Sequence, residues 1–138
     1  MLNKKNTFLD FISCTKYLIN NNYSRHRNIF IIDRFNSVIR GDVNKIRIGD
    51  NVNVQDGSII HATYKKSSTS IGNYVSLGHN AIIHGCKIDD FVLIGMGSIV
   101  MDNAIINSNS IIAAGSVILE NTIVAVSYTH LRAHETSI

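Results

Sequence analysis

Aliphatic residues recur at every sixth position through the second half of the chain. From Ile88 onward the sequence divides into six-residue units, each with Ile or Val first and a small or β-branched residue fifth. The first positions are Ile88, Ile94, Val100, Ile106, Ile112 and Ile118, and the fifth are Val92, Ser98, Ala104, Ser110, Ser116 and Thr122. A period of six fits neither a helix nor an alternating strand. It predicts a coil of short strands and tight turns, with every first residue pointing into one stacked core.

The same period extends upstream, with two irregularities. Eleven residues separate Ile60 from Ile71, which places a polar surface loop within Thr63–Ser70. Only five residues separate Ile83 from Ile88, a slip of one position. Glycine and asparagine at the turns supply the left-handed backbone that turns need. The sequence therefore predicts an all-β fold, a parallel β-helix of hexapeptide repeats, whose upstream units begin at Ile48, Val54, Ile71 and Leu77.

The chain is long enough for one globular domain, with 138 residues, of which 45% are hydrophobic and 17% charged. We expect a single β-helix domain over residues 1–125, with the clearest repeats over 46–123. Residues 126–138 include VSYTHLRAHET, which resembles a translated sequencing adapter. We therefore expect this tail, with His130 and His134, to be foreign to the natural protein. The coil would then end in an open strand edge.

Charge and cysteine content narrow the range of partners. The net charge is +3, and Lys and Arg are dispersed instead of clustered, which argues against a nucleic-acid surface. No apolar run reaches the length of a membrane span, so we expect no membrane partner. Cys14 and Cys86 do not make a disulfide framework, which favours a reducing compartment, the cytoplasm. We interpret Cys86 as a small buried or turn residue.

Three histidines interrupt the aliphatic pattern. Known hexapeptide β-helices are triangular and left-handed, with three units per turn, and we expect both features here from that resemblance. The unit at Ile83 then stacks on the unit at Ile60, and His61 and His84 lie one above the other, about 4.8 Å apart at the backbone. Two imidazole nitrogens that share a zinc ion need a separation of about 3.3 Å, and such side chains can converge to it. His79 lies on a different face and would complete a site with a neighbouring subunit, as in a cyclic trimer.

The segments VIRGDVNKIRIGDNVNVQDGSIIH and IGNYVSLGHNAIIHGCKIDDFVLIGMGSIV resemble the gamma-class carbonic anhydrases and their close relatives, over about residues 35–123. The resemblance implies reversible hydration of carbon dioxide to bicarbonate by a metal-bound hydroxide. It implies a divalent metal, zinc or iron, between the subunits of a homotrimer. The metal ligands that it implies are His61 and His84 of one subunit and His79 of the next.

Four polar residues also match the family. Arg40 and Asp42 match its RGD segment, which supports the interface and the site, and Gln55 and Asp56 match its QD pair, in which the glutamine orients metal-bound water. The chemistry agrees, because three neutral histidines leave an open position on a metal, which lowers the pKa of bound water towards 7. Asp42 or Asp56 could fix a histidine tautomer or hold Arg40. Two simpler interpretations stay open, a structural Arg40–Asp42 ion pair and an Asp56 that only caps turn amides.

Three departures from the family leave other functions open, and one of them is that the family's C-terminal helix, which packs along the β-helix, is missing and replaced by the tail. Val43 stands where a proton-moving acid can lie, and Thr63–Ser70 has no carboxylate, so proton export would rely on buffer or on a water chain. One alternative is an acyltransferase that uses a CoA thioester, typically with one histidine as general base and no metal. The other is a non-catalytic metal-binding trimer. Metal content separates the acyltransferase from the other two, and a hydration assay separates those.

Overall fold

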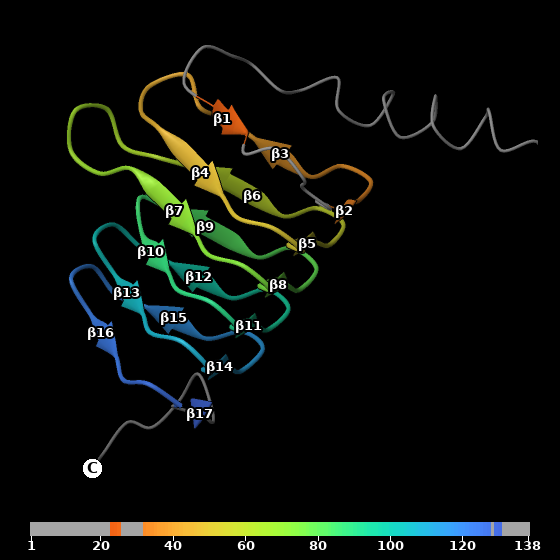
Figure 1. The fold of residues 1–138 in the computed structure, drawn as a ribbon, viewed down its shortest axis with the longest axis vertical. Coiled ribbons are helices and arrows are strands. Elements are labelled where there is room, and N and C mark those ends of the chain that lie inside the picture. Colours follow the sequence, from red (N-terminus) through yellow and green to blue (C-terminus); the bar gives the residue numbers. More distant parts are fainter. Residues whose placement is uncertain (1–22, 26–31, 128, 131–138) are drawn as a thin grey trace, which may run out of the picture.

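The chain coils into a three-sided prism of short strands (Figure 1). The structure, a computed structural model, describes residues 23–25, 32–127 and 129–130. Every regular element in these ranges is a strand. No helix that could span a bilayer occurs in the described ranges. Hydrogen-bonded neighbours within each sheet are always three strands apart in chain order. Each turn of the coil therefore contains three strands, which confirms the predicted three units per turn.

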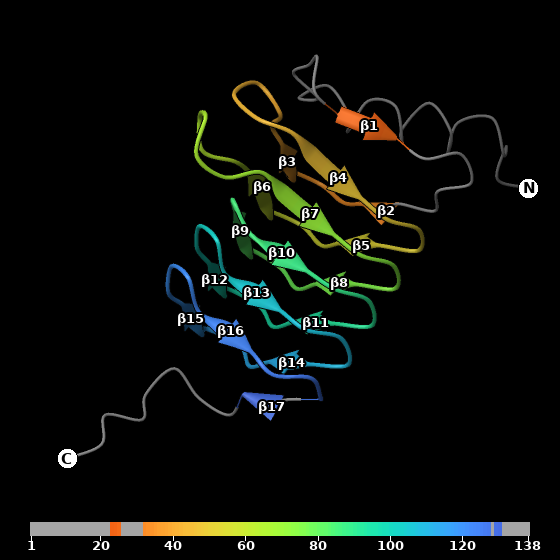
Figure 2. The same cartoon turned by 60° about the vertical axis from the view of Figure 1, so that its left-hand side comes forward.

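The described strands form three parallel sheets, and Figure 2 shows one of them, sheet A, as a stack from β1 to β16. Sheet A comprises β1 (Tyr23–Arg25), β4 (Ile46–Ile48), β7 (Thr69–Ile71), β10 (Lys87–Ile88), β13 (Ile105–Ile106) and β16 (Ile123–Val124). Sheet B comprises β2 (Ile32–Asp33), β5 (Asn53–Val54), β8 (Ser76–Leu77), β11 (Leu93–Ile94), β14 (Ile111–Ile112) and β17 (Thr129–His130). Sheet C comprises β3 (Val38–Ile39), β6 (Ile59–His61), β9 (Ile82–His84), β12 (Ile99–Val100) and β15 (Val117–Ile118).

The core is a column of aliphatic side chains along the axis of the coil. The first residue of every predicted unit from Ile48 to Ile118 is between 0% and 4% exposed. The fifth positions from Val92 to Ser116 are buried as well, and Thr122 is half-buried. Each buried aliphatic side chain contributes about 2 kcal/mol of burial free energy. Because each coil packs only on its neighbours, this column accounts for the stability of the prism, and it confirms the predicted core.

The turns between sheets use left-handed backbone. Asparagine supplies six of the ten such positions that are not glycine among the described residues, since its short polar side chain tolerates a positive φ. The asparagines with φ near +60° are Asn36, Asn51, Asn80, Asn103, Asn109 and Asn121. Tyr74 and Phe91 adopt the same conformation, and their rings stack with centroids 5.0 Å apart and planes 2° from parallel. The stacking offsets part of the backbone cost for these bulky residues.

Both irregularities of the repeat lie at the corner between sheets C and A. The extra residues form a tight loop closed by an antiparallel bridge between Thr63 and Ser67. The strands on either side stay in register, because Ile60 pairs with Ile83. The one-residue slip falls at Gly85, which has a left-handed φ of 57°. Both features of the sequence therefore change a corner and leave the stack of strands intact.

The coil begins earlier than the aliphatic pattern indicates. β1 and β2 pair with β4 and β5, although the residues before Phe35 follow the repeat poorly. Backbone hydrogen bonds do not depend on the side chains, so a ladder can extend beyond the repeat. Within the tail that we expect to be foreign, β17 pairs with β14. Residue 128 and residues 131–138, including His134, lie outside the described ranges.

The outer face of sheet C carries an unbroken column of β-branched aliphatic residues, called here the outer column. Its members occupy facing positions on successive strands and are Val38, Ile59, Ile82, Ile99 and Val117. Ile59 is 39% exposed and Val117 is 49% exposed. The equivalent column on sheet A is polar at its beginning, with Arg47, Ser70 and Lys87. Sheet C is therefore the described face best suited to burial against another molecule.

Candidate metal centre

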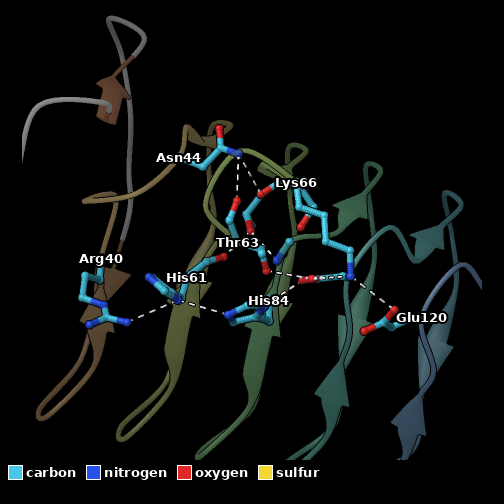
Figure 3. A network of polar contacts seen from close by, with 11 residues as sticks. Arg40, Asn44, His61, Thr63, Lys66, His84 and Glu120 are labelled. Atoms are coloured by element: carbon cyan, nitrogen blue, oxygen red, sulfur yellow. Dashed lines mark hydrogen bonds and ion pairs between the residues drawn. The ribbon is translucent and has the colours of Figure 1, made fainter.

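Two histidines meet on the outer face of sheet C. His61 ends β6 and His84 ends β9, and the two residues are paired in register. This pairing confirms the stacking predicted from the count of units. Nδ1 of His61 lies 3.1 Å from Nε2 of His84, and the ring centroids are 5.0 Å apart (Figure 3). Each histidine lies two residues after a member of the outer column on its own strand. Because side chains alternate along a strand, both histidines lie on the same face as that column.

Asp42 and Arg40 hold the outer side of His61. Nε2 of His61 lies 3.1 Å from Oδ1 of Asp42, and Arg40 Nη2 lies 3.4 Å from His61 Nδ1. Arg40 Nε is 3.6 Å from the same Asp42 oxygen. Desolvation opposes ionisation of Asp42, but the hydrogen bond from His61 and the charge of Arg40 outweigh it and lower its pKa. The Arg40–Asp42 ion pair therefore contacts the histidine pair directly.

A third acidic residue, Asp102, holds the other ring. Oδ1 of Asp102 accepts a hydrogen bond from His84 Nδ1 at 2.8 Å, and only 8% of the Asp102 side chain is exposed. Thr63 Oγ1 donates to Oδ2 of Asp102 at 2.7 Å. Burial opposes ionisation of Asp102, but these hydrogen bonds from Thr63 and His84 outweigh it and lower its pKa to about 2. Asp102 is a carboxylate at neutral pH and fixes the hydrogen of His84 on Nδ1.

Sequence reasoning missed Asp102, although the repeat contains a signal for it. Val100 lies one turn of coil after Ile83, and the two residues pair. Asp102 therefore faces Gly85 on the adjacent coil. It comes one position after the residue that faces His84. An acidic residue next to a histidine on adjacent coils is the arrangement that orients a metal ligand. The count of units that stacked the two histidines could have found it.

The loop at residues 63–67 reaches back over this site. Lys66 Nζ lies 3.5 Å from Asp102 Oδ2 and 3.5 Å from Glu120 Oε2. The loop is polar and on the surface, as predicted. Lys66 is half-exposed and pairs with carboxylates from two later coils. The loop itself lacks an acid, and later coils bring two acids, Asp102 and Glu120, next to its Lys66.

The other predicted site residues lie at the opposite ends of the sheet C strands, at the corner with sheet B. His79 Nδ1 is 3.1 Å from Asp56 Oδ2, while Asp56 Oδ1 accepts a hydrogen bond from the Phe35 amide at 3.0 Å. Asp56 thus caps a turn amide and also holds a histidine. Gln55 Nε2 donates to Asn53 Oδ1 at 3.1 Å, along the outer surface of sheet B.

The candidate residues therefore form two groups in one chain. The first half-site comprises Arg40, Asp42, His61 and His84, at the corner between sheets C and A. The second half-site comprises Gln55, Asp56 and His79, at the corner between sheets B and C. Across the described residues, no three His, Cys, Asp or Glu side chains of this single chain gather as a metal site.

The donor set of the first half-site fits a divalent metal ion. His61 donates from Nε2 to Asp42, and His84 donates from Nδ1 to Asp102. The two remaining nitrogens are lone-pair donors that face each other at 3.1 Å. Two imidazole nitrogens on one zinc ion lie about 3.3 Å apart. His61 Nδ1 also accepts from the Arg40 guanidinium at 3.4 Å, so the two nitrogens already lie beside one positive charge, and a metal ion that took its place would suit the same pair of lone pairs.

Cys86 is not placed to act as a ligand. Its side chain is 2% exposed, and burial raises the pKa of its thiol to about 12. A thiol with such a pKa stays protonated at neutral pH, whereas a metal binds the thiolate. The interpretation of Cys86 as a small buried residue is confirmed.

Comparison with known proteins agrees with this fold and these motifs. Residues 85–120 match the family described as "Bacterial transferase hexapeptide (six repeats)". A probable carbonic anhydrase of Methanocaldococcus jannaschii is 53% identical over 66 residues, which are 48% of this chain and 41% of that protein. A mitochondrial gamma carbonic anhydrase of Arabidopsis thaliana is 37% identical over 80 residues, which are 54% of this chain and 29% of that protein. The chain thus spans less than half the length of these two relatives.

A solved structure extends the match over more of the chain. The crystal structure of a Bacillus cereus putative acetyltransferase superposes with a TM-score of 0.63 at 33% identity, covering 74% of this chain and 68% of that one. The chain belongs to the hexapeptide-repeat family with the left-handed parallel β-helix fold, among the relatives of the gamma-class carbonic anhydrases.

Proposed function

We propose that this protein is a metal-dependent carbonic anhydrase-like lyase, which hydrates carbon dioxide reversibly to bicarbonate at a site shared between subunits. The observation that carries the proposal is the His61–His84 pair. Its two facing nitrogens lie 3.1 Å apart, and the other nitrogen of each ring is held by an aspartate. The similarity of about half of this chain to carbonic anhydrases supports the same reaction.

Three histidines would hold the ion, which we propose is zinc or iron. His61 and His84 of one subunit supply two ligands, and His79 of a neighbouring copy supplies the third. A divalent metal with three neutral histidine ligands lowers the pKa of a bound water molecule towards 7 and so supplies hydroxide at neutral pH. Asp42 and Asp56 would keep the tautomers of His61 and His79 suited to binding, and Arg40 would hold Asp42 in place.

Gln55 would act from the second half-site. Its carboxamide is partly exposed and bonded only to Asn53 among the described contacts, so it is free to turn towards a substrate. A carboxamide can both donate to and accept from a water molecule. We propose that Gln55 of the neighbouring copy orients the attacking oxygen.

The shape of the chain favours a cyclic trimer as the assembly that joins the half-sites. The half-sites flank opposite edges of sheet C, and the outer column lies between them. In a head-to-tail ring, one edge of each subunit meets the other edge of its neighbour, so each interface joins a first half-site to a second half-site. The outer column supplies an aliphatic surface at the same interfaces.

Mixing two inactive variants tests the split site. His79→Ala removes a ligand from the second half-site, and His84→Ala removes one from the first. In a mixed trimer, one interface joins an intact first half-site to an intact second half-site, so about one site in three should regain metal and hydration activity. The readouts are metal content by mass spectrometry and carbon dioxide hydration by stopped flow.

The matched control mixes His61→Ala with His84→Ala. Both substitutions lie in the same half-site, so no interface of a mixed trimer holds a complete set of ligands. Recovery in this control, or none with His79→Ala and His84→Ala in verified mixed trimers, would contradict the shared site. Metal recovery without hydration would instead indicate a non-catalytic metal-binding trimer.

A second candidate function is acyl transfer from a CoA thioester. It is favoured by the similarity to the Bacillus cereus putative acetyltransferase and to a transferase repeat family. In that case one histidine would act as general base without a metal. Titration of the purified protein with acetyl-CoA, with and without zinc, separates the two candidates: an acyltransferase binds acetyl-CoA and needs no metal, while a carbonic anhydrase-like protein takes up metal and ignores acetyl-CoA.

A further inference from the structure

Asp102 connects the histidine pair to a surface loop. It is the most buried of the three aspartates that hold a predicted histidine ligand, since Asp42 is 34% and Asp56 is 45% exposed at the side chain against 8% for Asp102. Its contact with His84, at 2.8 Å, is also the shortest of the three. Because the Asp102 carboxylate is buried and its contact is short, this bond restrains its ring more strongly than the other two restrain theirs.

The far side of the Asp102 carboxylate is held by the loop at residues 63–67. Thr63 Oγ1 donates to Oδ2 at 2.7 Å, and Lys66 Nζ lies 3.5 Å from the same oxygen. Asn44 Nδ2 fastens the loop by donating to the carbonyls of Thr63 and Ser67, at 3.0 and 3.1 Å. The loop therefore fixes the carboxylate from one side while His84 binds it from the other.

The absence of a side chain at Gly85 leaves the space that the Asp102 carboxylate occupies. A Cβ at this position would lie 2.2 Å from Asp102 Oδ1 and 2.2 Å from Ser67 Oγ. Because residue 85 is glycine, the backbone that follows His84 can pass directly beside Asp102. The motif HGC thus provides a ligand at His84 and the space for its carboxylate at Gly85.

We propose that Asp102 is the positioning residue of the metal site, and that the loop at residues 63–67 is the clasp that holds it there. Asp102 keeps the hydrogen of His84 on Nδ1 and leaves the lone pair of Nε2 directed towards His61. This proposal rests on the proposed metal function, because the position of His84 matters for the site only if a metal binds there. The hydrogen bond between Asp102 and His84 does not itself require a metal.

Asp102→Asn tests the proposal through metal affinity. The substitution keeps the shape of the side chain and removes its charge, which weakens the bond to His84 and the pair with Lys66. The dissociation constant for Zn²⁺, measured by chelator competition, should rise about 10- to 100-fold. Asp89→Asn is the matched control, since Asp89 pairs with Lys87 on the outside of sheet A and should leave the affinity unchanged.

A second readout does not need the metal. Nitrogen-15 NMR of the chelator-treated protein reports which ring nitrogen of His84 carries the hydrogen. We expect Nδ1–H in the unchanged chain and a mixture of both tautomers in Asp102→Ala, with circular dichroism confirming that the coil stays folded. An unchanged ring in Asp102→Ala, or Nε2–H in the starting protein, would overturn the positioning role.

The two readouts separate the two possible failures. If the unchanged chain binds no Zn²⁺ but His84 depends on Asp102 for its tautomer, the metal function fails and the positioning role stands. If the chain binds Zn²⁺ and Asp102→Asn binds it equally tightly, the metal function stands and the positioning role is wrong.

Discussion

His61 Nδ1 and His84 Nε2 face each other at 3.1 Å on adjacent strands of sheet C. Asp42 and Asp102 occupy the remaining nitrogen of each ring, so neither ring can relieve the contact by changing tautomer without losing a hydrogen bond. The Arg40 guanidinium, 3.4 Å from His61 Nδ1, offsets part of the repulsion between the two lone pairs, and a metal ion bound by both nitrogens would offset it fully. The pair is therefore an arrangement that binding of a metal should stabilise.

His84→Ala should abolish most metal binding and leave the coil folded. The imidazole points outward and is 36% exposed at the side chain, whereas the core beneath it is formed by Ile83. We expect metal content per chain to fall by more than about tenfold, because loss of one ligand weakens a three-histidine site strongly. Mass spectrometry of protein fractionated by size measures the metal, and far-ultraviolet circular dichroism checks the fold.

Lys87→Ala is the control for this experiment. Lys87 lies on the next strand, is exposed, and pairs only with Asp89 among the described contacts. It should retain full metal content. Full occupancy in His84→Ala would show that His84 is not a ligand.

Ile82→Glu should convert the proposed trimer into monomers. Ile82 lies at the centre of the outer column, between Ile59 and Ile99. Burial of an unpaired carboxylate at an interface costs several kcal/mol, so the dissociation constant of the assembly should rise at least about 100-fold. Analytical ultracentrifugation measures it.

Ser70→Glu is the matched control, because it introduces the same charge on the outer face of the adjoining sheet A. We expect it to sediment like the unchanged chain. If Ile82→Glu stays assembled and Ser70→Glu dissociates, the interface lies on sheet A and the split-site geometry is wrong.

Gly85→Ala should destabilise the protein more than Gly97→Ala does. Both glycines have left-handed φ, 57° and 66°, so each substitution incurs a backbone cost of about 1–2 kcal/mol. A Cβ at Gly97 would meet nothing within 4 Å, whereas one at Gly85 would collide with Asp102 and Ser67. We expect about 1–3 kcal/mol of additional loss in the free energy of unfolding for Gly85→Ala.

Urea denaturation of both glycine variants gives this difference directly. Gly85→Ala should also weaken Zn²⁺ binding, because a displaced Asp102 releases His84, while Gly97→Ala should bind normally. Equal losses of stability in the two variants would mean that the site yields to the extra methyl group without cost.

Cys86 should resist thiol reagents in the folded state. Burial raises the pKa of its thiol from 9.0 to about 12, so almost no thiolate is present at pH 8. In a Cys14→Ser background, we expect labelling by iodoacetamide at pH 8 to proceed at least about 100-fold faster in urea than in buffer. Rapid labelling in buffer would contradict the buried position.

The same shift predicts a pH dependence of stability. The unfolded thiol loses its proton near pH 9 and the folded thiol only near pH 12. The stability that the buried thiol contributes is therefore complete below pH 9 and is lost as the pH rises towards 12. Cys86→Ala should remove this part of the alkaline slope in urea denaturation.

The fold was predictable because one period controls it. Each buried side chain depends on its own place in a six-residue unit, so counting units from Ile60 to Ile83, with three units per turn as in known hexapeptide β-helices, placed His61 over His84. The beginning of the coil was not predictable in this way. β1 and β2 join the sheets through backbone pairing, which leaves no aliphatic signature before Phe35.

The candidate site was predictable only in part. The three histidines could be found because they interrupt the aliphatic pattern, and Asp56 because it matches the QD pair of the family that the sequence resembles. Asp102 and Lys66 could not be assigned from composition, since a single acid or lysine at a turn has many ordinary uses. Their role depends on which coils lie side by side after a loop of unusual length, and on where that loop folds back.

The loop at residues 63–67 leaves the strands on either side of it in register. In a solenoid, a corner can therefore gain or lose residues while the paired strands on either side of it keep their register. Such a scaffold separates two kinds of evolutionary change: the repeats set how the molecule holds together, and the length of one corner sets which side chains surround the chemistry. Proteins that share this coil are accordingly free to diverge in what they do through a few inserted residues.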